Sequence, residues 1–186
     1  MKHPSSREFF AYWDGQRGGE RAPDRSDIEP GPVRELLGDI FVLSYDPVDG
    51  HRFRVAGTRV CALLGRDLKA EAFAAQFVED SRREIDDLVG IVAEELLGIV
   101  AGVTGSTADG AKMPLEMLLL PFNNRAHTPL SLTGLLAPLS GEQHSQLRDL
   151  ALGSWRVINH PPQRFHPRAL RKWSVARGFM VYEGLR

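Results

Sequence analysis

The sequence predicts an α+β domain, in which helices cover one face of a single antiparallel sheet. Two alternating segments, over 40–44 and 51–56, come first and are joined by a turn. Helical patterns follow, and three apolar segments over 97–104, 115–120 and 130–137 come last. Helices inserted between two sets of antiparallel strands cover one face of a shared sheet. The chain has 186 residues, 42% of them hydrophobic, which is enough for one domain with a core.

Charge and cysteine content limit the expected partners and compartment. The formal net charge is -1, so no general attraction to nucleic acid or membrane is expected. Cys61 is the single cysteine, which excludes an internal disulfide and fits a reducing compartment. The first ten residues lack the apolar segment of a signal peptide, and no apolar run is long enough to span a bilayer. We therefore expect a cytoplasmic protein with no membrane contact.

An aromatic helix is predicted near the N-terminus. Positions 5–8 read Ser-Ser-Arg-Glu, which is a capping box that begins a helix, and the glycine pair at 18–19 ends it. Four aromatic residues within five positions are too many for one narrow buried stripe. They are therefore expected to pack on the domain and on a second copy of the chain. The predicted homodimer interface consists of Phe9, Phe10, Tyr12 and Trp13.

The strand over 51–56 has two distinct faces. Strand alternation places Phe53 and Val55 on the inner face, and Arg52 and Arg54 on the outer face. Glu116 occupies the outer face of a later, strongly apolar strand by the same rule. Arg54 is therefore the expected partner of Glu116.

The same strand ends in an abrupt corner. Gly57 lets the chain turn without a side-chain clash, Thr58 is a good N-cap, and Gly65 supplies a left-handed stop. A short helix between these positions presents an apolar face made of Val60, Leu63 and Leu64. Another short helix is predicted over 33–37, after the turn-rich connector 20–32.

A longer amphipathic helix follows, and the pattern weakens toward the C-terminus. A second capping box at 81–84 begins the helix, with apolar residues spaced to cover the sheet. Residues 147–158 fit either a helix or a strand. Pro167 is placed to open a helix that extends to Arg177, and residues 179–182 fit a short terminal strand.

Three segments of the chain resemble the signatures of the PAS_5 family, and they occur in the family's order: FFAYWDGQRGGERAPDRSDIEP, FRVAGTRVCALLGRDL and PLEMLLLPF. The resemblance extends from about residue 9 to residue 138. It implies a PAS-like fold with a five-stranded antiparallel sheet, helices over one face and an N-terminal helix. The chain then divides into an aromatic helix (1–19), a PAS-like domain (20–140) and a C-terminal extension (141–186) packed on or near the domain.

The resemblance also implies a role. PAS domains are sensory and interaction modules, many of which bind a small ligand between the sheet and its helices and dimerise through an N-terminal helix. Alternation assigns the lining of such a space to apolar residues, with Thr58 or Arg59 meeting the polar end of a small, largely apolar ligand. The candidate pocket residues are Phe53, Val55, Thr58, Arg59, Cys61, Leu64, Met117, Leu119 and Leu132.

The sequence favours no cofactor. Blue-light PAS domains hold a flavin with a cysteine and with neighbouring Asn and Gln residues, whereas the segment GTRVCALLG lacks the Asn and the Gln. Cys61 is therefore interpreted as a small buried hydrophobic residue. None of the six histidines lies in the helix over 81–92, where haem-binding PAS domains place an axial ligand. His160 and His166 have no third ligand nearby that would complete a metal site.

Enzymatic chemistry is not expected either. Glu116 has no second acid, histidine or nucleophile spaced to join it in catalysis. Arg25, Ser26, Asp27 and Glu29 are interpreted as an ionic and capping cluster in the connector, with a binding loop as the alternative.

The sequence therefore predicts a non-enzymatic, dimeric PAS-like module of bacterial signal transduction that interacts with a signalling protein and binds a small apolar ligand. The first alternative is an adaptor with a filled core and no ligand. The second is a nucleic-acid-binding regulator that uses the basic C-terminal tail. Basic clusters of this kind are more often simply a solvent-exposed face. The basic residues of this tail are Arg164, Arg168, Arg171, Lys172 and Arg177.

Overall fold

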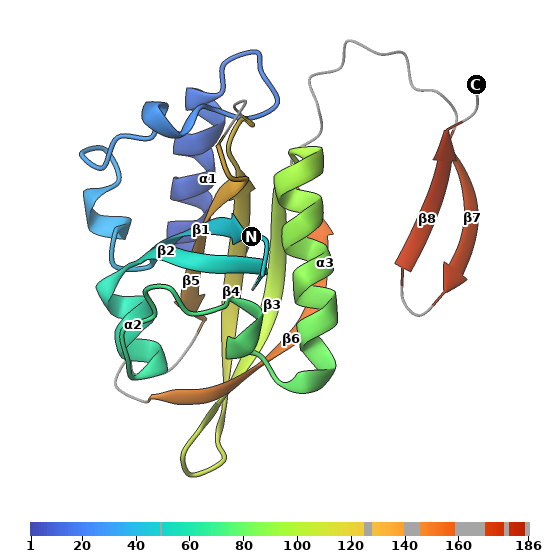
Figure 1. Ribbon diagram of the computed structural model, residues 1–186. Coiled ribbons are helices and arrows are strands. Elements are labelled where there is room, and N and C mark those ends of the chain that lie inside the picture. The colour runs from blue at the N-terminus through green and yellow to red at the C-terminus, as the bar shows by residue number, and fades with distance from the viewer. Residues whose placement is uncertain (49, 125–127, 140–145, 159–169, 177–178, 185–186) are drawn as a thin grey trace.

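The computed structural model describes residues 1–48, 50–124, 128–139, 146–158, 170–176 and 179–184 (Figure 1). Its main feature is a six-stranded antiparallel sheet in the order β2-β1-β5-β4-β3-β6. A further pair, β7 (Leu170–Ala176) and β8 (Phe179–Gly184), forms a separate two-stranded sheet. The strands of the main sheet are β1 (Ile40–Asp46), β2 (Gly50–Ala56), β3 (Ile99–Thr107), β4 (Lys112–Pro121), β5 (Ser131–Pro138) and β6 (Leu147–Val157).

The fold class is confirmed, with one strand more than the five expected. The segment whose sequence fitted either a helix or a strand is β6, and it pairs with β3 through most of its length. The open edge of β3 explains this outcome, because an edge strand carries unpaired backbone groups that a neighbouring segment can satisfy. Residues 170–176 form a strand in place of the predicted helix, since pairing with β8 overrides local propensity.

Helices between β2 and β3 cover the inner face of the sheet, as the sequence predicts. The first is α2 (Thr58–Leu64), which buries Val60, Leu63 and Leu64 and ends at Gly65 with a φ of 72°. The second is α3 (Glu79–Glu95), which runs alongside β3, with β6 passing behind it in the view of Figure 1. Its start differs from the predicted capping box: Ser81 lies inside the helix, and its Oγ accepts the N–H of Leu152 at 3.1 Å. That hydrogen bond connects α3 to β6.

The helix α1 (Pro4–Gln16) covers the opposite face of the sheet. The side chain of His3, and not a serine, caps its N-terminus by accepting the N–H of Ser5. Phe9 and Trp13 are fully buried, and the Trp13 indole N–H donates to the Pro121 carbonyl oxygen at 2.9 Å. These two side chains pack within their own chain against Val100, Leu118, Leu120 and Leu135. The prediction that they form a dimer interface is therefore wrong.

A β-bulge in β2 overturns the predicted inward position of Val55. Leu43 of β1 pairs with Phe53, whereas the preceding Val42 pairs with Val55, so Arg54 is an extra residue in the ladder. A bulge interrupts the alternation of faces from the point at which it occurs. Phe53 is buried as expected, but Val55 is 51% exposed. Val55 therefore lines no interior space.

Candidate functional site

The region between the sheet and its inner helices, where the sequence predicts a ligand pocket, holds a continuous cluster of buried apolar side chains. Five of the candidate pocket residues are buried there in one continuous apolar cluster: Phe53, Leu64, Met117, Leu119 and Leu132. Buried side chains of α3, among them Ile85 and Leu88, belong to the same cluster. The candidate pocket residues thus contribute to the contact between the sheet and the helices.

Four phenylalanine rings meet at the centre of this region. Phe73 lies 5.3 Å from Phe41, 5.4 Å from Phe53 and 5.5 Å from Phe77, measured between ring centroids. Phe41 and Phe53 are themselves 5.7 Å apart. These separations are the usual ones for aromatic rings in contact. Sequence reasoning missed Phe73 and Phe77, although their spacing of four residues was a signal that they share one side of the segment.

Cys61 lies at the margin of the core. It is half-buried, it packs against the apolar cluster, and its Sγ lies 3.9 Å from the carbonyl oxygen of Ala56. Thr58, one of the two residues expected to meet the polar end of a ligand, is exposed at the start of α2.

Arg59, the other such residue, forms a two-pronged ion pair. Its Nε donates to Oδ1 of Asp39 at 2.7 Å and its Nη2 donates to Oδ2 at 2.8 Å. The hydrogen bond to Asp39 raises the pKa of Arg59 above its ordinary value, against the opposing effect of burial. The guanidinium therefore connects α2 to the segment before β1, and it is already occupied.

The corner between β2 and α2 requires glycine at position 57, because the backbone before β1 approaches it closely. A Cβ at position 57 would lie 2.2 Å from the carbonyl oxygen of Leu37 and 2.3 Å from that of Gly38. Its backbone N–H donates to the Ile40 carbonyl oxygen at 2.8 Å. Backbone carbonyl groups thus occupy the volume that a side chain at position 57 would need, so this glycine has a structural role.

Glu116 lies on the outer face of the sheet, as alternation predicts, but its partners differ from the expected one. The backbone N–H of Lys2 donates to Oε2 at 2.5 Å, and that of His3 donates to Oε1 at 2.9 Å. Burial alone would raise the pKa of this carboxyl group, but the hydrogen bonds that it accepts lower it to below its ordinary value. The carboxylate stays ionised at neutral pH and holds the segment before α1 against β4. Its pairing with Arg54 is a wrong prediction.

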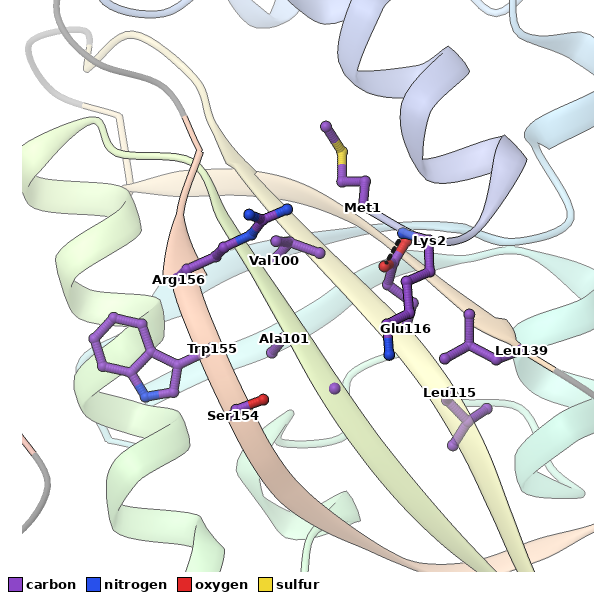
Figure 2. A pocket seen from close by; sticks show the side chains of 11 residues that line it. Met1, Lys2, Val100, Ala101, Leu115, Glu116, Leu139, Ser154, Trp155 and Arg156 are labelled. Atoms are coloured by element: carbon purple, nitrogen blue, oxygen red, sulfur yellow. Dashed lines mark hydrogen bonds between the residues drawn. The ribbon is translucent and has the colours of Figure 1, made fainter.

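A groove of about 370 Å³ opens beside Glu116 on the outer face of β3, β4 and β6 (Figure 2). Gly102 of β3, which carries no side chain, is one of the residues that line it. Trp155 turns away from the groove toward α3, where its indole N–H donates to Glu84 at 2.9 Å. Both Glu116 oxygens accept backbone hydrogen bonds from the N-terminal segment, so one wall of the groove is formed by this carboxylate and the residues that it holds.

Two further observations concern metals and membranes. Within the part of the chain that the structure describes, no group of three His, Cys, Asp or Glu side chains is arranged to hold a metal ion. No helix in these described ranges combines the length and the apolar character needed to cross a membrane. His160 and His166 lie outside the described residues.

The structural comparisons find distant similarity to solved PAS and LOV domains. The light-state LOV domain of the blue-light photoreceptor Aureochrome1 is 9% identical, with a TM-score of 0.44, and the match covers 58% of this chain and 86% of that one. A LOV protein from Rhodobacter sphaeroides is 10% identical, with a TM-score of 0.45 and coverages of 57% and 64%. The PAS domain of an HTR-like protein from Haloarcula marismortui is 18% identical, with a TM-score of 0.42 and coverages of 57% and 88%.

Sequence comparison identifies the family. No curated protein matches the chain. A family description of the PAS domain, PAS_5, matches residues 1–150, which span α1, the five predicted strands and the beginning of β6. The protein belongs to the PAS_5 family of PAS domains.

Proposed function

We propose that the protein is a non-enzymatic PAS module of signal transduction that acts through contacts with other proteins, with no ligand inside its core. The observation that carries this proposal is the cluster of Phe41, Phe53, Phe73 and Phe77, whose rings occupy the space between the sheet and the helices. A small-molecule pocket has a volume of roughly 300–1,000 Å³. An interior guest would have to displace several of these rings, which favours the adaptor over the ligand sensor.

Exposed apolar side chains support the choice of protein contacts. Among the described residues, four large apolar side chains are exposed, and all lie on or next to the β1–β2 hairpin: Leu37, Tyr45, Val48 and Val55. Val48 is 88% exposed at the hairpin turn. Isolated exposed apolar residues are ordinary, but Tyr45 and Val48 lie close together in the chain at the turn of the hairpin, where they mark a candidate contact surface. We assign the partner contact to this hairpin.

Self-association is proposed with a reduced interface. Phe9 and Trp13 are buried within the chain, so Phe10 and Tyr12, both half-buried, are the parts of the aromatic helix that stay accessible to a second copy. The Tyr12 hydroxyl also accepts the N–H of Glu29 at 2.9 Å, which fixes the helix to the connector. Light scattering on the intact protein and on a Phe10→Ser variant measures this contact directly, and a dimer that survives the substitution excludes it.

Photo-crosslinking in cells tests the proposal, with native mass spectrometry as its second measurement. A photoreactive residue at position 48 should capture a protein, whereas the same residue at exposed position 108, in the β3–β4 turn, should not. The mass of the purified chain should equal that of the polypeptide alone. Equal capture at the two positions contradicts the assigned surface, and a retained stoichiometric small molecule contradicts the filled core.

A further inference from the structure

Two arginines from distant parts of the chain line one small cavity on the outer side of the sheet. Arg25 comes from the 3₁₀ turn Arg25–Asp27 in the connector after α1, and Arg54 comes from β2. The cavity has a volume of about 230 Å³. The rest of its lining is rich in hydroxyl and amide groups and consists of Ser44, Asn123, Thr128, Pro129 and Ser131.

The bulge in β2 explains how Arg54 reaches this cavity. Arg54 is the extra residue between the Leu43–Phe53 and Val42–Val55 pairs, and bulges commonly redirect a side chain. Ser44 of β1 is paired with Ser131 of β5 in the adjacent ladder, so their hydroxyl groups are neighbours on the sheet. Arg54, Ser44 and Ser131 therefore come from three adjacent strands, β2, β1 and β5.

The connector is fixed where it brings Arg25 to the sheet. The N–H of Asn123 donates to the Pro23 carbonyl oxygen at 2.9 Å, which attaches the connector to the end of β4. The N–H of Asp24 donates to Oδ2 of Asp27 at 3.0 Å in a capping box, which shapes the turn that carries Arg25. The position of Arg25 is therefore set by backbone contacts and does not depend on a partner for its guanidinium.

Within the described parts of the chain, the guanidinium groups of Arg25 and Arg54 lie near each other's positive charge and have no acidic partner. Partial burial and the positive charge of Arg54 lower the pKa of Arg25. Among the residues that the structure describes, neither group donates a hydrogen bond to an acid or makes an ion pair. Three other arginines of the chain do pair with carboxylates: Arg17 with Asp14 at 2.6 Å, Arg59 with Asp39 at 2.7 Å and Arg66 with Glu71 at 3.1 Å.

We propose that Arg25 and Arg54 together bind a phosphate group, either as free phosphate or as the monoester of a small molecule. Two guanidinium groups can each present two N–H donors to a tetrahedral oxyanion, which is the geometry that arginine matches best. The hydroxyl groups of Ser44 and Ser131 and the Asn123 amide supply further donors. An anion between the arginines also removes the repulsion between them. This site is separate from the packed core. A phosphate group bound here would therefore let the module respond to a ligand without an interior pocket.

Isothermal titration of the full chain, in a chloride buffer of low ionic strength, tests the assignment. Inorganic phosphate and phenyl phosphate should each bind at one site, and acetate should bind more weakly than either. Arg25→Ala and Arg54→Ala should each raise the Kd about tenfold or more. Arg54→Lys, which keeps the positive charge but loses the paired N–H donors of the guanidinium, should give an intermediate Kd. Arg148→Ala, which removes an exposed arginine from β6, should leave the Kd unchanged.

Thermal melting separates a binding role from a structural one. Without phosphate, the Arg25→Ala and Arg54→Ala variants should melt at or above the wild-type temperature, because each loses a repulsion. Phosphate should raise the wild-type melting temperature and leave that of the two variants unchanged. A preference for phenyl phosphate identifies a monoester as the ligand, and a preference for the inorganic ion identifies free phosphate. Absence of wild-type binding, tighter acetate binding, or equal Kd values in the wild type and both alanine variants overturns the proposal.

Discussion

Replacing Phe73 with alanine removes the ring that touches the three other phenylalanines of the core. Phe73 is 3% exposed, and its ring centroid lies within 5.5 Å of the rings of Phe41, Phe53 and Phe77. Truncation of a buried phenylalanine costs about 3–5 kcal/mol, since contacts are lost and a cavity is left. Each aromatic pair adds about 0.5–1.5 kcal/mol beyond its buried area. The loss expected for Phe73→Ala therefore lies in the upper part of the range of about 3–5 kcal/mol. The melting temperature should fall by roughly 6–20 °C, at about 2–4 °C per kcal/mol.

Urea unfolding followed by circular dichroism measures this loss, with the slope of the transition compared between variants. Val48→Ala is the matched control, because Val48 is 88% exposed and its truncation should change the free energy of unfolding by less than about 0.5 kcal/mol. A ring that lined an open pocket would have few neighbours to lose. A loss below about 1 kcal/mol for Phe73→Ala would therefore refute the reasoning that these rings fill the core.

Three further predictions concern the corner, the outer face and the bulge. Gly57→Ala should destabilise the fold by about 1–3 kcal/mol or more, because its Cβ would overlap the Leu37 carbonyl oxygen, and a wild-type denaturation midpoint would exclude this contact. Glu116→Gln should cost about 1–3 kcal/mol at neutral pH by weakening hydrogen bonds to a buried carboxylate. The folded-state pKa of Glu116 is lowered, so its contribution is present above the ordinary carboxyl pKa and disappears as pH falls through the lowered value; a wild-type advantage that does not shrink in acid contradicts this linkage. Val55→Trp should leave the free energy of unfolding within about 0.5 kcal/mol, because Val55 is exposed beyond the bulge, and a large loss would mean that it faces the core.

Local patterns were sufficient for the elements that depend on neighbours in the chain. The positions of β1, β2 and α2 follow from alternation, glycine placement and apolar spacing within about 25 residues. The family resemblance implied an antiparallel sheet with helices over one face and an N-terminal helix, and these features are present. What the sequence could not give depends on distant partners. The β6 strand needs the free edge of β3, and the bulge at Arg54 exists only in relation to the register of β1.

The candidate site shows the same division. Alternation placed Glu116 on the outer face, but its hydrogen-bond donors lie more than 100 positions away in the chain, so local spacing pointed to the wrong partner. Five of the nine pocket candidates lie in the apolar cluster between the sheet and the helices, yet alternation says only which way a side chain points. Whether the space is open or filled depends on Phe73 and Phe77, which enter it from the segment between α2 and α3. That segment carries no strand pattern.

A crystal structure under xenon pressure tests the filled core most directly, because xenon enters apolar cavities that water leaves empty. We expect no xenon among Phe41, Phe53, Phe73 and Phe77 in the wild-type protein. The Phe73→Ala variant, in which a cavity has been made at the same place, should bind xenon there and so serves as the positive control. Xenon bound between these four rings in the wild-type crystal, with the rings in their present positions, would contradict the filled core and restore the internal ligand pocket.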